Sequence, residues 1–313
     1  MLAERIHNTI RFFDLQQFPL TAFEIHRYLI TDLKTLRSKI DESYELRVGA
    51  NNETTQPLQP PIHFDTILTQ LRVLVFEKRI AERNGFYCLI GRDSLVADRQ
   101  KNYLNGLKRE KLIARYMPAV KHLPFVRSVA LLGSQAMGQQ KPTSDIDLFV
   151  ITDPRFLGLG RFFITSYFQI LGLRRHDKKV ANRFCLNHYL AGSLPLSEDR
   201  NLYTALEYAK FRSLVRGTGF KKFLVQNNWI SEFLPHFKPA AQTPQSSTTK
   251  LQNFFEGFFD NRFGLWLEQR MINSQLKRIE KGKFNIASTK ELSFHPNNRK
   301  QKLFEDFFAK GNV

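Results

Sequence analysis

The stretch 126–151 reads VRSVALLGSQAMGQQKPTSDIDLFVI and decides the fold. It begins and ends with apolar runs, VRSVALL and SDIDLFVI, that are typical of buried strands. Gly133 and Ser134 follow the first run and predict a tight turn whose backbone N–H groups and hydroxyl can hold a phosphate. Because residues i and i+2 of a strand face the same side, Asp145 and Asp147 present two carboxylates side by side.

Paired carboxylates in a buried strand predict a metal site. Two such acids repel each other and require a cation. Mg²⁺, or Mn²⁺ in its place, suits the pair because it takes oxygen ligands and completes its shell with substrate phosphates. Such an ion screens a triphosphate, activates an attacking hydroxyl and stabilises the pyrophosphate leaving group. We therefore expect Asp145 and Asp147 to bind metal in catalysis, with Lys141 and Ser144 completing a nucleotide site. The alternative is an Asp-x-Asp pair that only caps a turn.

The sequence Gly133-Ser-Gln-Ala-Met-Gly138, followed by Ser144-Asp-Ile-Asp-Leu148, resembles the signature of the DNA polymerase beta superfamily of nucleotidyltransferases. The likeness is to its minimal members and to the kanamycin nucleotidyltransferase group. It is tight over the quoted residues and loose over the surrounding chain. It implies an α/β fold with a mixed sheet, an NTP with Mg²⁺ as donor, and pyrophosphate as product. By position, Gly133 and Ser134 would hold the triphosphate. Met137 departs from the pattern, since minimal members often have Arg there.

A third carboxylate is the second departure from the resemblance. Many active members place an acid on a later strand, often as the base for the acceptor hydroxyl. The matching strand here is predicted over 183–190, and its candidate on the catalytic face is Asn187. An amide can ligate Mg²⁺ but cannot take a proton at neutral pH. His188 is expected on the other face, in the core. The base then comes from elsewhere, with Asp177 a weaker substitute, or the metal alone activates the acceptor, or the enzyme is slow or inactive.

The N-terminal residues 1–98 predict a winged helix-turn-helix. A helix over 6–13, a capping box from Thr21 to Glu24 that opens a second helix, and a helix over 64–75 precede a hairpin at Asn84-Gly85. A polar loop is expected over 37–61. Many winged helices place their third helix in a DNA groove, and others contact proteins.

The net charge of +18 over 313 residues is spread through all parts of the chain. Such a charge favours a nucleic-acid partner, RNA before DNA, and its alternative is a solvated basic surface. The basic residues expected at that interface lie in the predicted helix over 99–121 and in the segment 174–179. They are Lys108, Arg109, Lys111, Arg115, Arg174, Arg175, Lys178 and Lys179. A hydrophobic content of 42% excludes general disorder, and two cysteines exclude a disulfide scaffold.

Five regions are expected along the chain. They are the winged-helix domain at 1–98, an α/β nucleotidyltransferase core at 99–192, a helical extension closing the cleft at 193–237, a linker at 238–250 and basic, Phe-rich helices at 251–313. The extension is predicted as two helices, over 198–215 and 220–233, and a last short helix is predicted over 299–310.

The C-terminal aromatic stripe of Phe255, Phe259, Phe263, Trp266 and Leu267 is expected to bury against the body or a second copy, which would give a homo-oligomer. The apolar run 156–173 is expected as a buried helix and not a membrane span. With no targeting signal in the sequence, we expect a cytoplasmic protein.

Three functions compete. The first is nucleotidyl transfer to a nucleic-acid 3′ end, most naturally RNA. The second keeps the donor but changes the acceptor to a protein hydroxyl (AMPylation) or a small molecule. The third is a winged-helix nucleic-acid-binding protein that senses NTP without catalysis. Asn187 supports this function, because it stands where many active members have a third acid.

Overall fold

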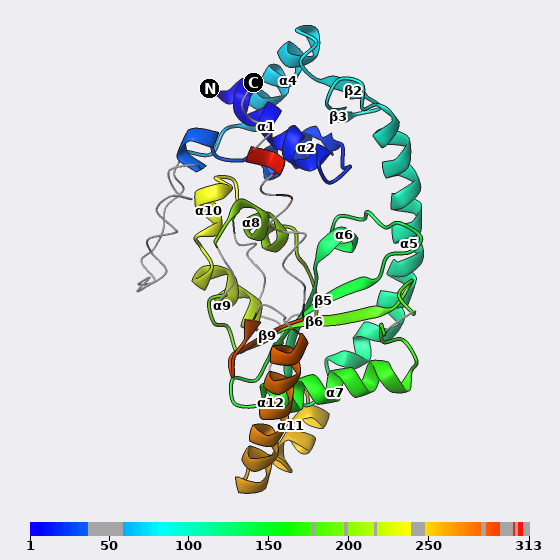
Figure 1. Ribbon diagram of the computed structural model, residues 1–313, viewed down its shortest axis with the longest axis vertical. Coiled ribbons are helices and arrows are strands. Elements are labelled where there is room, and N and C mark those ends of the chain that lie inside the picture. The colour runs from blue at the N-terminus through cyan, green and yellow to red at the C-terminus, as the bar shows by residue number, and fades with distance from the viewer. Residues whose placement is uncertain are drawn as a thin grey trace.

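The structure is a computed structural model that describes residues 1–36, 59–176, 179–196, 200–215, 218–238, 248–282, 286–294, 303 and 306–308. Its centre is a six-stranded sheet of order β7-β4-β5-β6-β9-β8 (Figure 1). The strands are β4 (Val126–Leu131), β5 (Ile146–Thr152), β6 (Phe184–Ala191), β7 (Arg212–Val215), β8 (Ile286–Ala287) and β9 (Glu291–Ser293). Strands β5 and β6 are parallel and the other neighbours are antiparallel. The expected mixed sheet of an α/β protein is confirmed.

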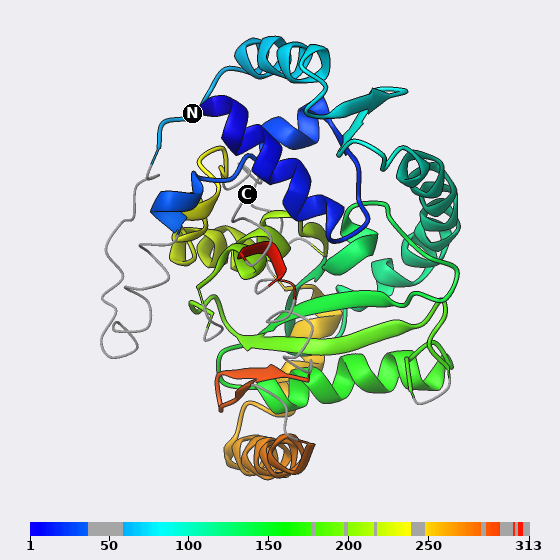
Figure 2. The same ribbon diagram turned by 45° about the horizontal axis from the view of Figure 1, so that its top comes forward.

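Helices cover both faces of this sheet (Figures 1 and 2). One face packs on α7 (Leu157–Ile170), on α12 (Arg262–Gly282) and on the C-terminal half of α5 (Ser94–Val120), through Leu148, Val150 and their neighbours. The other face, which includes Phe149 and Ile151, packs on α8 (Leu202–Ala209), α9 (Thr218–Gln226) and α10 (Ile230–Phe233). Helix α7 is the apolar run 156–173, and none of the described helices is both long and apolar enough to cross a membrane.

The N-terminal unit consists of α1 (Leu2–Asp14), β1 (Leu20–Thr21), α2 (Ala22–Arg27), α4 (Phe64–Phe76), β2 (Ala81–Arg83) and β3 (Phe86–Cys88). Its strands form a small antiparallel sheet of order β1-β3-β2. The capping box is confirmed, because Thr21 Oγ1 accepts from the backbone N–H of Glu24 and the Glu24 carboxylate accepts from that of Thr21. The hairpin is confirmed as well, with φ of 52° at Asn84 and 78° at Gly85. Residues 37–58 of the predicted polar loop lie outside the described residues.

The N-terminal unit and the sheet share a core and are joined by α5. The backbone N–H of Thr31 donates to Phe233 O at 2.9 Å, so the unit rests on α10. The guanidinium of Arg99, on α5, pairs with Glu24 at 2.6 Å and lies over the Phe18 ring. The boundary expected between residues 98 and 99 therefore falls inside one continuous helix.

The extension differs from the prediction in two places. The helix expected over 198–215 ends at Ala209, and residues 212–215 form β7 on the edge of the sheet beside β4. Hydrogen bonds to β4 prevail there over the helical spacing of the apolar residues. The helix expected over 220–233 is divided between α9 and α10. At the break Asn227 donates to Phe223 O and accepts from Leu196 N and from Trp229 Nε1.

The C-terminal region begins with α11 (Lys250–Gly257) and α12, which extend from the foot of the molecule (Figure 1). Glu256 on α11 binds Arg127 of the sheet at 2.7 Å. Of the predicted aromatic stripe, only Phe259 and Leu267 pack against the body. The expected burial against the body is wrong for three members, which are exposed: Phe255, Phe263 and Trp266.

The predicted linker and last helix are described only in part. Residues 239–247 of the linker lie outside the described residues, and so does most of 299–310. Phe307, within the helical residues 306–308, is fully buried and packs edge-on against Phe12 of α1. The short strands β8 and β9 were not predicted, and they extend the sheet beyond β6.

Candidate active site

Two carboxylates and a thiol gather where β5 and β6 begin. Asp145 directly precedes β5 and Asp147 is its second residue, so the expected alternation places both on one side. In the parallel register, Cys185 of β6 lies opposite Asp147. One ligand atom from each of Asp145, Asp147 and Cys185 lies within 4.8 Å of the others. The predicted pair is therefore brought together, and a third potential metal ligand joins it.

The electrostatics of this group favour a bound cation. Burial, then repulsion by Asp145 and by Glu207, raises the pKa of Asp147 from its usual 3.8 to about 7. Glu207 lies on α8, the helix that packs on the Phe149 side of the sheet, and its charge acts on Asp147 from there. Burial and the two aspartates also raise the pKa of the Cys185 thiol. A divalent ion would relieve the repulsion between Asp145 and Asp147, because it supplies the missing positive charge.

Arg175 is the cation that the protein itself supplies. Its backbone N–H donates to Phe184 O at 2.9 Å, which fixes the segment after α7 beside the start of β6. Its Nη1 donates to Asp145 Oδ2 at 2.7 Å and to Cys185 Sγ at 3.2 Å. The side chain is 41% exposed and can turn away. Arg175 was expected at a nucleic-acid interface, and the structure places it on the carboxylate group.

The Gly133-Ser134 turn lies directly against Asp147. Gly133 has φ of +61°, and a Cβ on it would come within 2.9 Å of Asp147 Oδ2, so no other residue fits without displacing the carboxylate. The chain then enters the short helix α6 (Gly133–Ala136). Ser134 is exposed, and its Oγ accepts from Gln140 Nε2 at 3.1 Å. The turn and the carboxylates therefore form one continuous surface.

Helix α5 holds the segment between the turn and the carboxylates. Nη2 of Arg109 donates to the carbonyl oxygens of Lys141, Pro142 and Ser144, each at 3.0 Å. The side chain is only 2% exposed, so the prediction that Arg109 contacts nucleic acid is wrong. Burial among three carbonyl groups gives it a positioning role that composition did not reveal. The sequence does contain a signal for this burial: Arg109 follows Gly106 by three residues and precedes Ile113 by four, and both of these lie on the buried face of α5.

The remaining predicted residues occupy varied positions. Lys108, Lys111 and Arg115 are exposed on α5, and so are Leu104 and Leu107 of the same helix. Lys141 is exposed and its Nζ donates to Gln17 Oε1 of the N-terminal unit at 3.3 Å. Ser144 and Arg174 are partly buried, and Lys179 is exposed. Asp177 and Lys178 lie outside the described residues.

The third-carboxylate position is affected by a change of register. Strand pairing shifts after Leu148–Leu186, so that Phe149 is opposite His188 and Asn187 lies at the irregularity. The Asn187 side chain lies outside the described residues, and its role stays a prediction. His188 is in the core, as expected, but on the Phe149 side of the sheet. Its Nε2 contacts Glu291 Oε1 at 2.8 Å and its Nδ1 contacts the Tyr208 hydroxyl at 2.9 Å.

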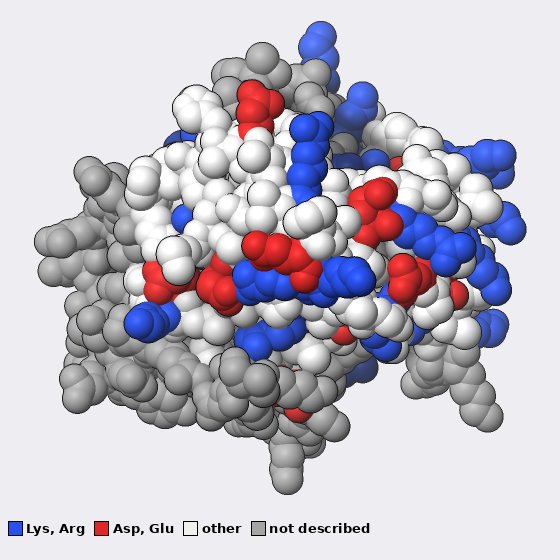
Figure 3. All heavy atoms as spheres, turned by 90° about the horizontal axis from the view of Figure 1, so that it is seen from above, with Lys and Arg blue, Asp and Glu red and all other residues white. Residues whose placement is uncertain are grey.

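Basic residues are distributed unevenly over the surface. Seen from above, the N-terminal unit carries Lys and Arg interspersed with Asp and Glu (Figure 3).

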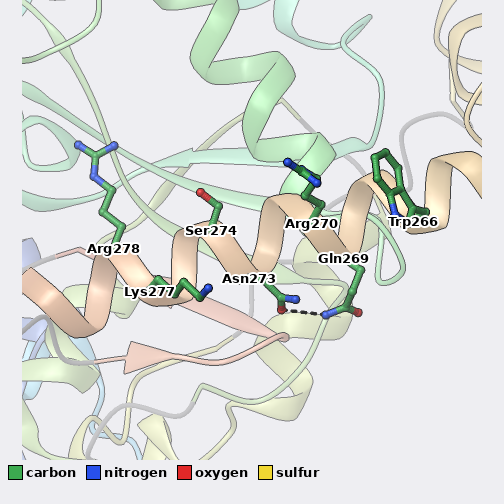
Figure 4. Close-up of a pocket in the computed structure, with 7 residues that line it drawn as sticks. All are labelled: Trp266, Gln269, Arg270, Asn273, Ser274, Lys277 and Arg278. Atoms are coloured by element: carbon green, nitrogen blue, oxygen red, sulfur yellow. Dashed lines mark hydrogen bonds between the residues drawn. The ribbon is translucent and has the colours of Figure 1, made fainter.

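A hollow of about 800 Å³ lies along α12 (Figure 4). It is lined by Trp266, Gln269, Arg270, Asn273, Ser274, Lys277 and Arg278. This hollow belongs to the C-terminal helices and includes none of the carboxylate group.

Comparison with known families identifies the chemistry of this region. Residues 113–187 match the family model described as a nucleotidyltransferase domain. The match runs from the second half of α5 to β6 and contains the Gly-Ser turn, both aspartates and Cys185. It supports a nucleotidyltransferase of the polymerase beta type, a transferase that acts on an NTP. No curated protein and no solved structure matches the chain.

Proposed function

We propose that this protein transfers a nucleoside monophosphate from an NTP to an acceptor hydroxyl and releases pyrophosphate, in a reaction that depends on a divalent metal. The observation that carries the proposal is the placement of Asp145 and Asp147 against the Gly133-Ser134 turn within the matched domain. In the reaction the acceptor oxygen bonds to the α-phosphorus, the bond from that phosphorus to the pyrophosphate breaks, and the hydroxyl proton leaves to water or a base.

The donor set fits a divalent metal, because two carboxylates converge and because burial, together with repulsion by Asp145, raises the pKa of Asp147 to about 7. Asp145 and Asp147 would hold the ion, with Asn187 as the further candidate from β6. When bound, Mg²⁺ or Mn²⁺ would neutralise the triphosphate and make the acceptor hydroxyl more acidic. For the base that takes the acceptor proton, the structure adds Glu207 as a candidate, because its charge acts on Asp147.

The residues around the carboxylates would bind the triphosphate. Gly133 lets the backbone approach a phosphate closely, and the exposed Ser134 hydroxyl can donate to one. Lys141 and Ser144 lie on the segment held by Arg109. Arg175 is free to turn from Asp145 to a phosphate oxygen once a metal takes the carboxylates, because its attraction to them is then lost.

The proposed acceptor is the 3′ end of an RNA. The net charge of +18 and the exposed basic residues of α5, Lys108, Lys111 and Arg115, support a polyanion. The order of helices and strands in the N-terminal unit supports a winged helix. Because the upper face of this unit carries both basic and acidic residues, the unit would contact few phosphates of a bound RNA. We also propose a cytoplasmic location and a homo-oligomer formed through the exposed aromatic side chains of α11 and α12.

Two alternatives have specific support. Transfer to a protein hydroxyl or a small molecule is favoured by the charge on the N-terminal unit, which is mixed and not uniformly basic. NTP sensing without catalysis, by a winged-helix nucleic-acid-binding protein, is favoured by the thiol of Cys185 and the amide of Asn187 at the start of β6, where an acid would be the usual third group.

One assay separates these functions. The protein is incubated with α-labelled NTPs, Mg²⁺ or Mn²⁺, bulk RNA and DNA, and the labelled species are resolved. We expect label on RNA, lost in Asp145→Ala and Asp147→Ala and kept in the matched control Asp98→Ala, which removes an exposed carboxylate of α5. Label on the protein itself would indicate AMPylation. NTP binding without labelling of any species would indicate a sensor.

A further inference from the structure

We infer that Cys185 is the third metal-facing group of this site and that it makes the site select ions that accept sulfur, such as Co²⁺ and Zn²⁺, over Mg²⁺. The inference rests on the proposed metal site at Asp145 and Asp147. It adds a ligand of different chemistry, and with it a preference that two carboxylates alone would not have.

The position of Cys185 is set by the strand register. Cys185 is 2% exposed and lies opposite Asp147, in the parallel pair β5–β6. Its sulfur and one oxygen from each aspartate lie within 4.8 Å of one another. A tetrahedral ion with a sulfur at about 2.3 Å and an oxygen at about 2.1 Å holds these two ligands about 3.6 Å apart. Small side-chain adjustments therefore suffice to bring all three onto one ion.

The contacts of the thiol show that it belongs to the charged group and not to the apolar core. Arg175 Nη1 donates to both Cys185 Sγ and Asp145 Oδ2. One cation thus already touches the sulfur and a carboxylate together. A metal ion that replaces the guanidinium would inherit the same pair of partners and would add Asp147.

The identity of the ion follows from the donor atoms. Mg²⁺ prefers oxygen ligands and would leave the thiol protonated, so the ion would be held by Asp145 and Asp147 without the sulfur. Co²⁺ or Zn²⁺ forms a metal–sulfur bond, and the thiol proton is released to the solvent as that bond forms. No electron is transferred. The protein should therefore bind Zn²⁺ and Co²⁺ with the Cys185 sulfur as a ligand and Mg²⁺ without it.

The test is a titration of the full-length protein with Co²⁺, without nucleotide, followed by absorbance. Thiolate ligation gives a sulfur-to-cobalt charge-transfer band in the near ultraviolet. We expect the band in the wild type and in Cys88→Ser, which alters the other cysteine of the chain, buried in β3. We expect no band in Cys185→Ser. That substitution should weaken Zn²⁺ binding by at least about tenfold and leave Mg²⁺ binding nearly unchanged.

A second variant guards against a folding defect. Cys185→Asp replaces sulfur by a carboxylate, so it should lose the cobalt band and bind Mg²⁺ more tightly than the wild type. Cobalt binding without a charge-transfer band in the wild type would overturn the inference, and so would a band that survives in Cys185→Ser. If labelling of RNA with Mg²⁺ depends on both aspartates while the band is absent, only the inference fails. If the band depends on Cys185 but no acceptor is labelled with any ion, only the proposed transfer fails.

Discussion

Replacing Asp147 by Asn should stabilise the metal-free protein, although Asp147 is central to the proposed site. The carboxylate titrates near pH 7 in the folded chain, against a usual value of 3.8. A difference of about three pKa units at 1.36 kcal/mol each means that ionised Asp147 costs the folded state about 4 kcal/mol. Asn has nearly the same shape and carries no charge, so Asp147→Asn removes up to this amount.

The sign and the pH window follow from the raised pKa. Between pH 4 and pH 7 the folded protein holds a proton on Asp147 that the unfolded chain has lost, so wild-type stability falls as the pH rises through this window. The advantage of Asp147→Asn should be about 0.5 kcal/mol at pH 4, reach about 1.5 kcal/mol at pH 5 and level off at about 4 kcal/mol above pH 7.

Urea unfolding in EDTA at pH 5, 6 and 8 measures this difference. Asp98→Asn, which changes an exposed carboxylate of α5, is the matched control and should show no such dependence on pH. Adding Mn²⁺ at a hundred times its Kd should reduce the advantage of Asp147→Asn at pH 8 from about 4 to about 1.3 kcal/mol, because the ion stabilises the wild type by about 2.7 kcal/mol and binds the variant poorly. A variant that is no more stable than the wild type at pH 8, or whose advantage does not vary with pH, would refute the reasoning.

Three further predictions concern the basic residues. Arg175→Ala should bind Mn²⁺ more tightly in the absence of nucleotide, because the guanidinium no longer competes for Asp145. The same variant should bind NTP more weakly. Calorimetry with Mn²⁺ and with NTP measures both affinities, and Lys179→Ala is the control. Arg109→Met should lose about 2–3 kcal/mol in urea unfolding, since three carbonyl groups lose their donor, whereas the exposed Lys111→Met should change stability by less than about 0.5 kcal/mol. RNA affinity in filter binding should fall steeply between about 50 and 200 mM salt, and a flat response would favour a protein or small-molecule acceptor.

Where local and tertiary preferences agree, the fold could be predicted from the sequence. The runs that form β4 and β5 are apolar enough to be buried strands in any arrangement, and Asn84-Gly85 requires a turn whatever surrounds it. Strand β7 gave no such signal. Residues 212–215 continue the apolar spacing of α8, and only the free edge of β4 makes them a strand.

The residues of the candidate site likewise differ in how well the sequence predicts them. Asp145 and Asp147 could be found because their spacing, their apolar flanks and the preceding turn all lie within one stretch of sequence. Cys185 was missed because a search for a third acid passes over a thiol, and because pairing between β5 and β6 is not encoded in either strand alone. Arg109 was misplaced because a basic residue in a basic helix resembles its exposed neighbours until the helix face is fixed by packing.

The continuity of α5 links the two ends of the molecule mechanically. The helix has 27 residues and so spans about 40 Å. Arg99 links the N-terminal part of the helix to the N-terminal unit through its ion pair with Glu24. Gly106 and Arg109, in the middle of the helix, contact the segment that follows the Gly-Ser turn. A ligand that tilts the N-terminal unit would also move α5. Through α5 it would move the segment that follows the phosphate-binding turn. Occupancy of the two regions should then be coupled with equal strength in both directions, so that NTP alters the affinity of the N-terminal unit for its partner by the same factor as the partner alters the affinity for NTP.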